Sequence, residues 1–121
     1  MPYAKFGNFW KIYKTFDLNN IKMLSRNDIL TFLSENKPFL QKEFHLTEIG
    51  LVGSFSRNEQ KEDSDIDIVV DFEPNTSKLF DLHLQLQGFL SENFKKNVDI
   101  GTIKYLKPYY KEVILKDAIF I

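Results

Sequence analysis

The chain contains no cysteine, which excludes a disulfide framework and a thiolate zinc site and is compatible with a reducing cytoplasm. It also lacks an apolar run near the roughly 20 residues of a membrane span, and it has no signal-peptide pattern. A formal net charge of -1 does not provide the basic surface with which proteins track a long nucleic acid. We therefore expect a cytoplasmic protein with no membrane span and no direct binding to long nucleic acids.

The composition indicates one globular domain with an aromatic core. Hydrophobic residues account for 43% and charged residues for 27% of the 121 residues, and twelve phenylalanines can fill one modest core. We expect this domain to span residues 23–121. Residues 1–22 are rich in aromatics and lysine. We interpret them as an extra helix over the core or a leader upstream of Met23, with a docking arm for a partner or an anionic surface as the alternative.

Helical periodicity is clearest in two segments. Ser25 can cap a helix, because Asp28 follows it at the spacing of a capping box. The buried stripe of this helix would consist of Ile29, Leu30, Phe32 and Leu33. Pro38 either ends this helix or opens a second short one. A longer helix is predicted over about eighteen residues from Thr76, although residues 81–87 taken alone alternate like a strand.

Three short strands are predicted around these helices. They cover residues 47–53, 65–72 and 97–102, and the second is especially rich in the β-branched residues that strands favour. Pro108 suits the first turn of a last helix that runs to about Lys116, and residues 118–121 close the chain. Helices and strands thus interleave, which favours an α/β (α+β) fold with a small mixed sheet flanked by helices.

Asp65 and Asp67 are separated by one residue at the start of the second predicted strand. Alternate residues of a strand project to the same side, so these carboxylates lie about 6.5 Å apart along the backbone and repel each other unless a cation sits between them. Asp99, between two apolar residues of another predicted strand, also points away from the core. Three acids from two strands are what two-metal phosphoryl transfer requires, so we expect divalent-cation ligands here.

Gly53 and Ser54 end the first predicted strand. Glycine lets the backbone approach a ligand closely, and the N–H groups of a tight turn form an anion site to which the Ser54 hydroxyl adds a donor. No Gly-Lys-Ser/Thr follows, so this is not a P-loop. Arg57 and Lys61 flank the turn and are candidate contacts to a triphosphate, with solvated loop charges as the alternative. Lys104 is a weaker candidate of the same kind.

These two motifs together resemble the signature of the DNA polymerase β-like nucleotidyltransferase superfamily: Gly53-Ser54, ten intervening residues, then Asp65-Ile66-Asp67. Within the superfamily, the chain is similar to the minimal nucleotidyltransferase (MNT) branch from Met23 to the C-terminus. The similarity is carried by the segments LVGSFSR, SDIDIVVDF, KKNVDIGT and ILKDAIFI. One departure is Asn58, where many relatives have glycine after the arginine, and residues 1–22 have no counterpart.

The resemblance implies a nucleotidyltransferase fold and a role for each matched residue. Asp65 and Asp67 would bind two Mg²⁺ ions, Asp99 would complete the site or act as the base, and Gly53 with Ser54 would hold the phosphates of ATP. The resemblance further implies a HEPN-domain partner, often a ribonuclease toxin. The MNT protein is then the antitoxin, and it transfers AMP from ATP to a tyrosine of the toxin. A homo-oligomer or a hetero-oligomer is compatible with this role.

Three hypotheses of function follow. The first is a Mg²⁺-dependent enzyme that adenylylates a HEPN toxin. The second replaces the protein acceptor by a small-molecule hydroxyl; the absence of an acceptor-binding domain argues against it. The third is an antitoxin that acts by binding alone, with a vestigial nucleotide site; the intact set of three acids argues against it.

For the histidines and for the tyrosines near the C-terminus, only the degree of burial is predicted. His45 and His83 are expected at surface or boundary positions, because the predicted site needs no imidazole. Tyr105, Tyr109 and Tyr110 are expected to be buried or at a boundary, with contact to a partner as the alternative.

Overall fold

The structure is a computed structural model that describes residues 23–121, so the predictions for residues 1–22 lie outside the described residues. Its centre is a four-stranded sheet in the order β3-β2-β1-β4. β1 is antiparallel to β2 and to β4, whereas β2 and β3 are parallel. The predicted small mixed sheet is therefore confirmed. The strands are β1 (Leu46–Val52), β2 (Ile66–Phe72), β3 (Val98–Thr102) and β4 (Ile119–Phe120).

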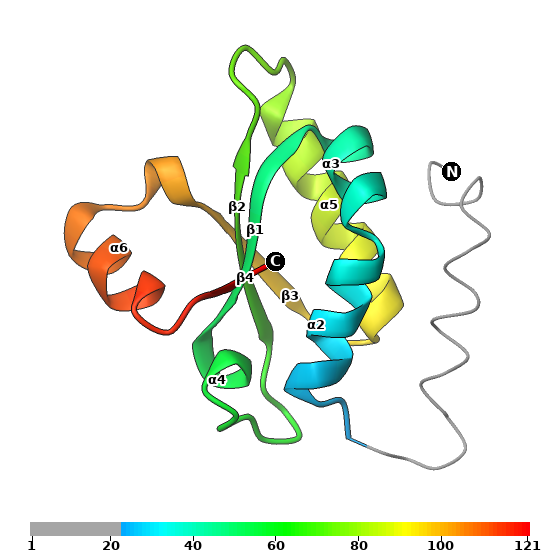
Figure 1. The fold of residues 1–121 in the computed structure, drawn as a ribbon, viewed down its shortest axis with the longest axis vertical. Helices are drawn as coiled ribbons and strands as arrows, with labels where there is room; N and C mark the ends of the chain where they lie inside the picture. The colour runs from blue at the N-terminus through cyan, green and yellow to red at the C-terminus, as the bar shows by residue number, and fades with distance from the viewer. Residues whose placement is uncertain (1–22) are drawn as a thin grey trace.

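The helices lie on both sides of the sheet (Figure 1). One side carries α2 (Arg26–Glu35), α3 (Lys37–Phe44) and α5 (Leu79–Phe94), and the other side carries α6 (Pro108–Leu115). Two short elements were not predicted as helices: α4 (Gly53–Ser56), where the sequence indicated a tight turn, and the 3₁₀ helix η1 (Ile103–Tyr105). Both follow strands directly, at positions where local sequence gives no helical periodicity because the elements are too short.

The ends of the helices follow local chemistry. The Ser25 backbone N–H donates to Asp28 Oδ2 over 2.9 Å, and the Asp28 N–H donates to Ser25 Oγ over 3.1 Å, so the predicted capping box is confirmed. Pro38 stands in the first turn of α3, so it opens a second helix. α5 begins at Leu79, later than predicted, because Lys78 adopts the left-handed conformation with φ 56°. No helix among residues 23–121 is long and apolar enough to cross a membrane.

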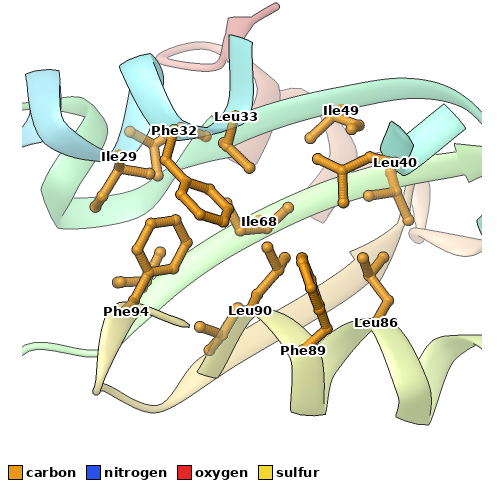
Figure 2. Packing of buried hydrophobic residues seen from close by; sticks show 14 of the residues in the cluster. Ile29, Phe32, Leu33, Leu40, Ile49, Ile68, Leu86, Phe89, Leu90 and Phe94 are labelled. Carbon is orange, nitrogen blue, oxygen red and sulfur yellow. The ribbon is translucent and has the colours of Figure 1, made fainter. Parts of the chain in front are cut away.

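The main core lies between the sheet and the layer of α2, α3 and α5 (Figure 2). Phe32 and Phe94 meet edge to face with ring centroids 4.9 Å apart, and Phe89 packs beside them. α5 buries Leu86, Phe89, Leu90 and Phe94, which is a helical and not a strand-like pattern. Burial on one face of a sixteen-residue segment therefore settles the ambiguity of residues 81–87 in favour of a helix.

A smaller cluster lies on the opposite face of the sheet, under α6. Val52, Val69 and Ile103 are buried there, and Leu106, Ile114 and Leu115 pack against them. In β2, Ile66, Ile68 and Val70 belong to the main core instead. Since side chains alternate along a strand, the other residues of β2, including Asp67, face the α6 side of the sheet.

Candidate active site

Two of the predicted site residues are register partners on neighbouring strands. Asp67 of β2 pairs with Asp99 of β3 in the parallel part of the sheet. Adjacent strands are about 4.8 Å apart, and parallel partners share a face, so both carboxylates stand on the α6 side. Asp65 lies one residue before β2, where Ile66 begins the strand. The structure thus brings Asp67 and Asp99 together and leaves Asp65, which is exposed, at the entrance to the strand.

The pKa of the Asp67 carboxyl is raised above its ordinary value. The largest cause is its partial burial, followed by the negative charges of Asp99 and then Asp65, whereas Arg57 acts in the opposite direction. The negative charges of Asp99 and Asp65 thus add to the cost of ionising the partly buried Asp67 carboxyl, and the repulsion from Asp65 is the one that the sequence predicts. A bound cation would relieve this repulsion, because it favours the ionised form of each carboxyl.

Gly53 begins α4 with φ +76°, the left-handed region in which glycine carries no steric penalty. A Cβ atom built on Gly53 would overlap the Oδ2 atom of Asp67. This contact follows from the sheet, since Val52, the last residue of β1, pairs with Asp67. The backbone of the turn therefore runs directly beside the central aspartate, and only glycine leaves room for both.

The remainder of α4 fixes the turn and leaves one hydroxyl available. Ser56 Oγ donates to the Gly53 carbonyl over 2.8 Å, and the Glu59 N–H donates to the Ser54 carbonyl over 2.8 Å. Within residues 23–121, the Ser54 hydroxyl makes no hydrogen bond, so it can serve a ligand. The first N–H groups of a helix also lack acceptors within the helix. α4 therefore offers backbone N–H groups and the Ser54 hydroxyl as donors, next to the turn whose first residue contacts Asp67.

The loop between the turn and the aspartates is held at several points. Asn58 adopts φ 60°, a left-handed conformation that asparagine tolerates better than most other residues except glycine. The Arg26 guanidinium donates to the Ser56 carbonyl over 3.2 Å, and Lys96 Nζ donates to the Glu62 carbonyl over 2.7 Å. These bonds hold the loop from both sides and so maintain the spacing between α4 and the acids.

Arg57 has two acidic partners that the sequence did not suggest as site residues. Its Nε donates to Glu59 Oε1 over 2.9 Å, and its Nη1 lies 3.9 Å from Asp117 Oδ2. Glu59 was within reach of sequence reasoning, because it follows Arg57 by two positions. Asp117 was not, because it lies after α6 and meets Arg57 only in the folded chain. The position of Arg57 beside Asp67 is nevertheless compatible with its predicted contact to a triphosphate.

Other charged residues on this face are engaged elsewhere. Asp71 accepts the backbone N–H of Lys104 over 3.0 Å, so it fixes the start of the connection to α6. Asp71 is four residues beyond Asp67, about 13 Å along an extended strand. The backbone of Lys104 therefore lies away from the three aspartates, and its weaker candidacy as a triphosphate contact gains no support. Lys61, on the loop, is exposed.

The prediction for the three tyrosines is wrong. Tyr105, Tyr109 and Tyr110 are 65%, 73% and 57% exposed. The reason is that Leu106, Ile114 and Leu115 provide the contacts of this segment with the sheet, which turns the tyrosines outward. The histidine predictions are confirmed, since His45 is exposed and His83 is half-buried.

Comparison with known proteins shows the family of the chain. Residues 28–121 match the family model described as a nucleotidyltransferase domain. The chain belongs to this family of nucleotidyltransferases. Protein adenylyltransferase MntA of Thermococcus cleftensis is 35% identical over 99 residues, which cover 82% of this chain and 98% of that protein. A candidate protein adenylyltransferase of Methanocaldococcus jannaschii is 35% identical over 100 residues, with 82% of this chain and all of that protein covered.

Solved structures show the same nucleotidyltransferase fold. A candidate minimal nucleotidyltransferase superposes with a TM-score of 0.66 at 28% identity, covering 79% of this chain and 95% of that chain. A toxin–antitoxin structure with AMP-PNP superposes with a TM-score of 0.57 at 24% identity, covering 80% of this chain and 72% of that chain. At this identity, the second similarity shows the fold alone.

The residues of this nucleotidyltransferase fit a metal that is shared with a nucleotide. Among residues 23–121, no three His, Cys, Asp or Glu side chains are placed to hold a metal ion by themselves. Mg²⁺ is commonly bound through one or two carboxylates together with substrate phosphates. Asp65 and Asp67 provide such carboxylates, and α4 places phosphate donors beside them. The carboxylates and the N–H groups of α4 therefore fit metal ions that bind together with a nucleotide. They do not form a complete metal site by themselves.

Replacing Ser54 should weaken nucleotide binding moderately. Ser54→Ala removes one hydrogen-bond donor, which costs about 1 kcal/mol, or roughly fivefold in affinity for ATP. Ser56→Ala is the matched control. It also removes one serine hydroxyl from α4, but the Ser56 hydroxyl is already bonded to the Gly53 carbonyl and supports the shape of the turn. Isothermal titration with ATP and Mg²⁺ measures both variants. Unchanged affinity in Ser54→Ala, with an intact fold, would exclude the hydroxyl as a ligand.

Neutralising Asp67 should stabilise the protein in the absence of ligands. Its raised pKa means that the folded state disfavours the ionised carboxyl, so Asp67→Asn should raise the melting temperature by a few degrees at neutral pH. The folded protein holds the proton more tightly than the unfolded chain. The penalty therefore appears as the pH rises through the interval between the unfolded pKa, about 3.9, and the raised folded pKa.

The stabilisation by Asp67→Asn should accordingly be largest at neutral pH and disappear below about pH 4. Thermal melts across this pH range provide the measurement. Asp63→Asn, in the exposed loop, is the control for removal of one negative charge from the chain. A melting temperature that falls in Asp67→Asn at neutral pH would show that the carboxylate is held by favourable contacts instead of repulsion.

Proposed function

We propose that this nucleotidyltransferase transfers AMP from ATP to a tyrosine hydroxyl of a partner protein, a HEPN-type toxin, and thereby acts as its antitoxin. The observation that carries the proposal is the pairing of Asp67 with Asp99 beside the glycine turn. Relatives at 35% identity, matched over nearly their whole length, are named protein adenylyltransferases. Because the match covers nearly the whole length of these relatives, we infer that the acceptor of this chain is also a protein.

The proposed reaction is a substitution at the α-phosphorus of ATP. The acceptor oxygen forms a bond to this phosphorus, the bond between it and the bridging oxygen to the β-phosphorus breaks, and pyrophosphate leaves with that oxygen. The hydroxyl proton passes to a carboxylate or to water. Mg²⁺, when bound, supplies positive charge that neutralises the phosphates and lowers the pKa of the attacking hydroxyl.

The residues of the chain would divide this work between them. Gly53 and Ser54 donate to the phosphates and orient the α-phosphorus toward the acids. Asp65 and Asp67 hold the ions that accompany ATP. Asp99 would accept the proton from the acceptor hydroxyl, and its register pairing with Asp67 supports this role. Arg57 would contribute positive charge to the triphosphate, and its opposing effect on the pKa of Asp67 supports this role.

The toxin part of the proposal has two supports. The motifs of the chain resemble the MNT branch, whose members commonly pair with HEPN-domain proteins. Structures that share this fold include toxin–antitoxin complexes, among them one named MntA-HpeT. The domain itself is small, so the acceptor hydroxyl should arrive on a second macromolecule that completes the site.

Labelled nucleotides test the proposed reaction. The protein is incubated with the product of its neighbouring gene, Mg²⁺ and ATP that carries ³²P at either the α or the γ position. We expect label on the partner only from α-labelled ATP, and none when EDTA is present. Label from the γ position would indicate a kinase-type transfer, and no label from either position would contradict the proposal. Transfer to a small molecule but not to the partner would favour the second hypothesis instead.

A further inference from the structure

Asp117 connects the C-terminal part of the chain to the candidate active site through Arg57. Its Oδ2 atom lies 3.9 Å from Arg57 Nη1, and the two side chains are 41% and 43% exposed. The pKa of the Arg57 guanidinium is raised, first by its hydrogen bond to Glu59 and further by the charges of Glu59, Asp117 and Asp67, whereas desolvation lowers it. One guanidinium therefore stands among three carboxylates, of which Asp67 alone has a role in the proposed reaction.

The backbone around Asp117 is held by the fold on both sides. Before it, α6 ends, and the Ala118 N–H donates to the Leu115 carbonyl over 3.2 Å to close a turn. Ala118 packs against the smaller cluster under α6. After it, Ile119 pairs with Leu51 in the antiparallel part of the sheet. The position of Asp117 is thus tied to the same sheet that carries the aspartates of the site.

Glu59, the other partner of Arg57, belongs to the same loop as the arginine. The bond from Arg57 Nε to Glu59 Oε1, at 2.9 Å, orders the guanidinium relative to the loop. By itself this bond does not fix the guanidinium relative to the sheet, because both partners lie in the loop. Asp117 supplies that second constraint, since it comes from the connection between α6 and β4. An arginine that is already restricted loses less rotamer freedom when it binds a ligand.

We propose that Asp117 is a positioning residue that holds the Arg57 guanidinium ready for the triphosphate of ATP. This role rests on the proposed function, in which Arg57 contributes positive charge to the triphosphate. Without Asp117, the attraction of Asp67 for the guanidinium would be opposed by Glu59 alone. Arg57 would then approach Asp67 more often and compete with the metal ion for that carboxylate.

Two effects of Asp117 on ATP binding have opposite signs. Its hold on Arg57 favours binding, whereas its own negative charge repels the triphosphate. The first effect should be larger, because water and salt strongly screen the repulsion from an exposed carboxylate. The second effect does not need Arg57. Removing the charge of Asp117 should therefore weaken ATP binding in the wild type but not in a chain without the guanidinium.

A double-mutant cycle on the whole chain tests the proposal, with ATP and Mg²⁺ as the probe. Isothermal titration gives the Kd of ATP for the wild type, Asp117→Asn, Arg57→Gln and the double variant. Asp117→Glu is the conservative variant, since it retains the carboxylate. Glu112→Gln is the matched control, because it removes one exposed negative charge from α6. Thermal melts show whether each variant folds.

We expect Asp117→Asn to weaken ATP binding about fivefold when Arg57 is present. In the Arg57→Gln chain, the same substitution should leave the Kd unchanged or lower it by up to about twofold. Asp117→Glu and Glu112→Gln should bind ATP like the wild type. The melting temperature should change by a few degrees at most, because exposed ion pairs contribute little to stability.

Equal or tighter ATP binding by Asp117→Asn would overturn the proposal, as would an equal loss in both backgrounds or the absence of ATP binding by the wild type. An equal loss would show that Asp117 acts on the site without Arg57. The assay with labelled ATP separates these results from the proposed function. The expected coupling with no AMP on the partner would contradict the proposed function alone. AMP on the partner without any coupling would contradict the role of Asp117 alone.

Discussion

Gly53→Val should abolish nucleotide binding and nucleotidyl transfer. Valine is strained at φ +76°, and its Cβ would overlap the Asp67 carboxylate. Either α4 or Asp67 has to move, which separates the phosphate donors from the acids. Since misplacement of reacting groups by about 1 Å can cost about 100-fold in rate, we expect a loss of at least this size.

Two further glycine variants make this result interpretable. Gly53→Ala should show a smaller but substantial loss, because alanine provides the overlapping Cβ without β-branching. Gly88→Ala changes an exposed glycine inside α5 and should stabilise the protein by about 0.5–1 kcal/mol without affecting transfer. Activity is measured by AMP transfer and folding by thermal melts. Full activity of a folded Gly53→Val protein would show that the turn does not approach the nucleotide.

Asp67→Asn should lose transfer activity while it gains stability. Asparagine keeps the size of the side chain but removes the charge that would hold a divalent ion, so transfer should fall on the order of 1000-fold, equivalent to about 4 kcal/mol. Asp99→Ala should also abolish transfer, because it removes the carboxylate that we propose as the proton acceptor. ATP should still bind to Asp99→Ala, since Gly53 and Ser54 remain.

The combination of gained stability and lost activity distinguishes this explanation from a damaged fold. A misfolded variant would lose both properties, whereas removing a charge that burial and the neighbouring acids disfavour raises stability while transfer is lost. Asp63→Asn should change neither transfer nor stability by much, because its side chain is exposed in the loop. Comparable transfer by the wild type and Asp67→Asn at saturating Mg²⁺ would remove Asp67 from the site.

The local parts of the site could be predicted from the sequence. The sequence predicts that Asp65 and Asp67 project to one side of a strand, of which Asp67 lies inside β2 and Asp65 directly before it, and the glycine before Ser54 marks a turn. These inferences depend only on the pleat of a strand and on the conformational freedom of glycine. The position of Asp99 beside Asp67 could not be predicted from local sequence alone. Its pairing with Asp67 results from the parallel register of β2 and β3, which periodicity can suggest but not fix.

Two features could not be obtained from the sequence, because they depend on contacts between distant segments. The approach of Asp117 to Arg57 requires the path of the chain through α6. The exposure of Tyr109 was also missed, since aromatic residues near the end of a small domain usually join its core. Here Ile114 and Leu115 provide the packing against the sheet, and the tyrosines remain outside.

Intact-mass spectrometry of the partner most directly tests the proposed passage of AMP from ATP to the partner protein at the three aspartates. The partner is incubated with this protein, ATP and Mg²⁺, and separately with Asp99→Ala. We predict an added mass of about 329 Da, or a multiple of it, with the wild type only, because AMP is transferred with loss of water. A partner that stays unmodified, yet is bound tightly and silenced by the wild type, would contradict the account and establish an antitoxin that acts by binding alone.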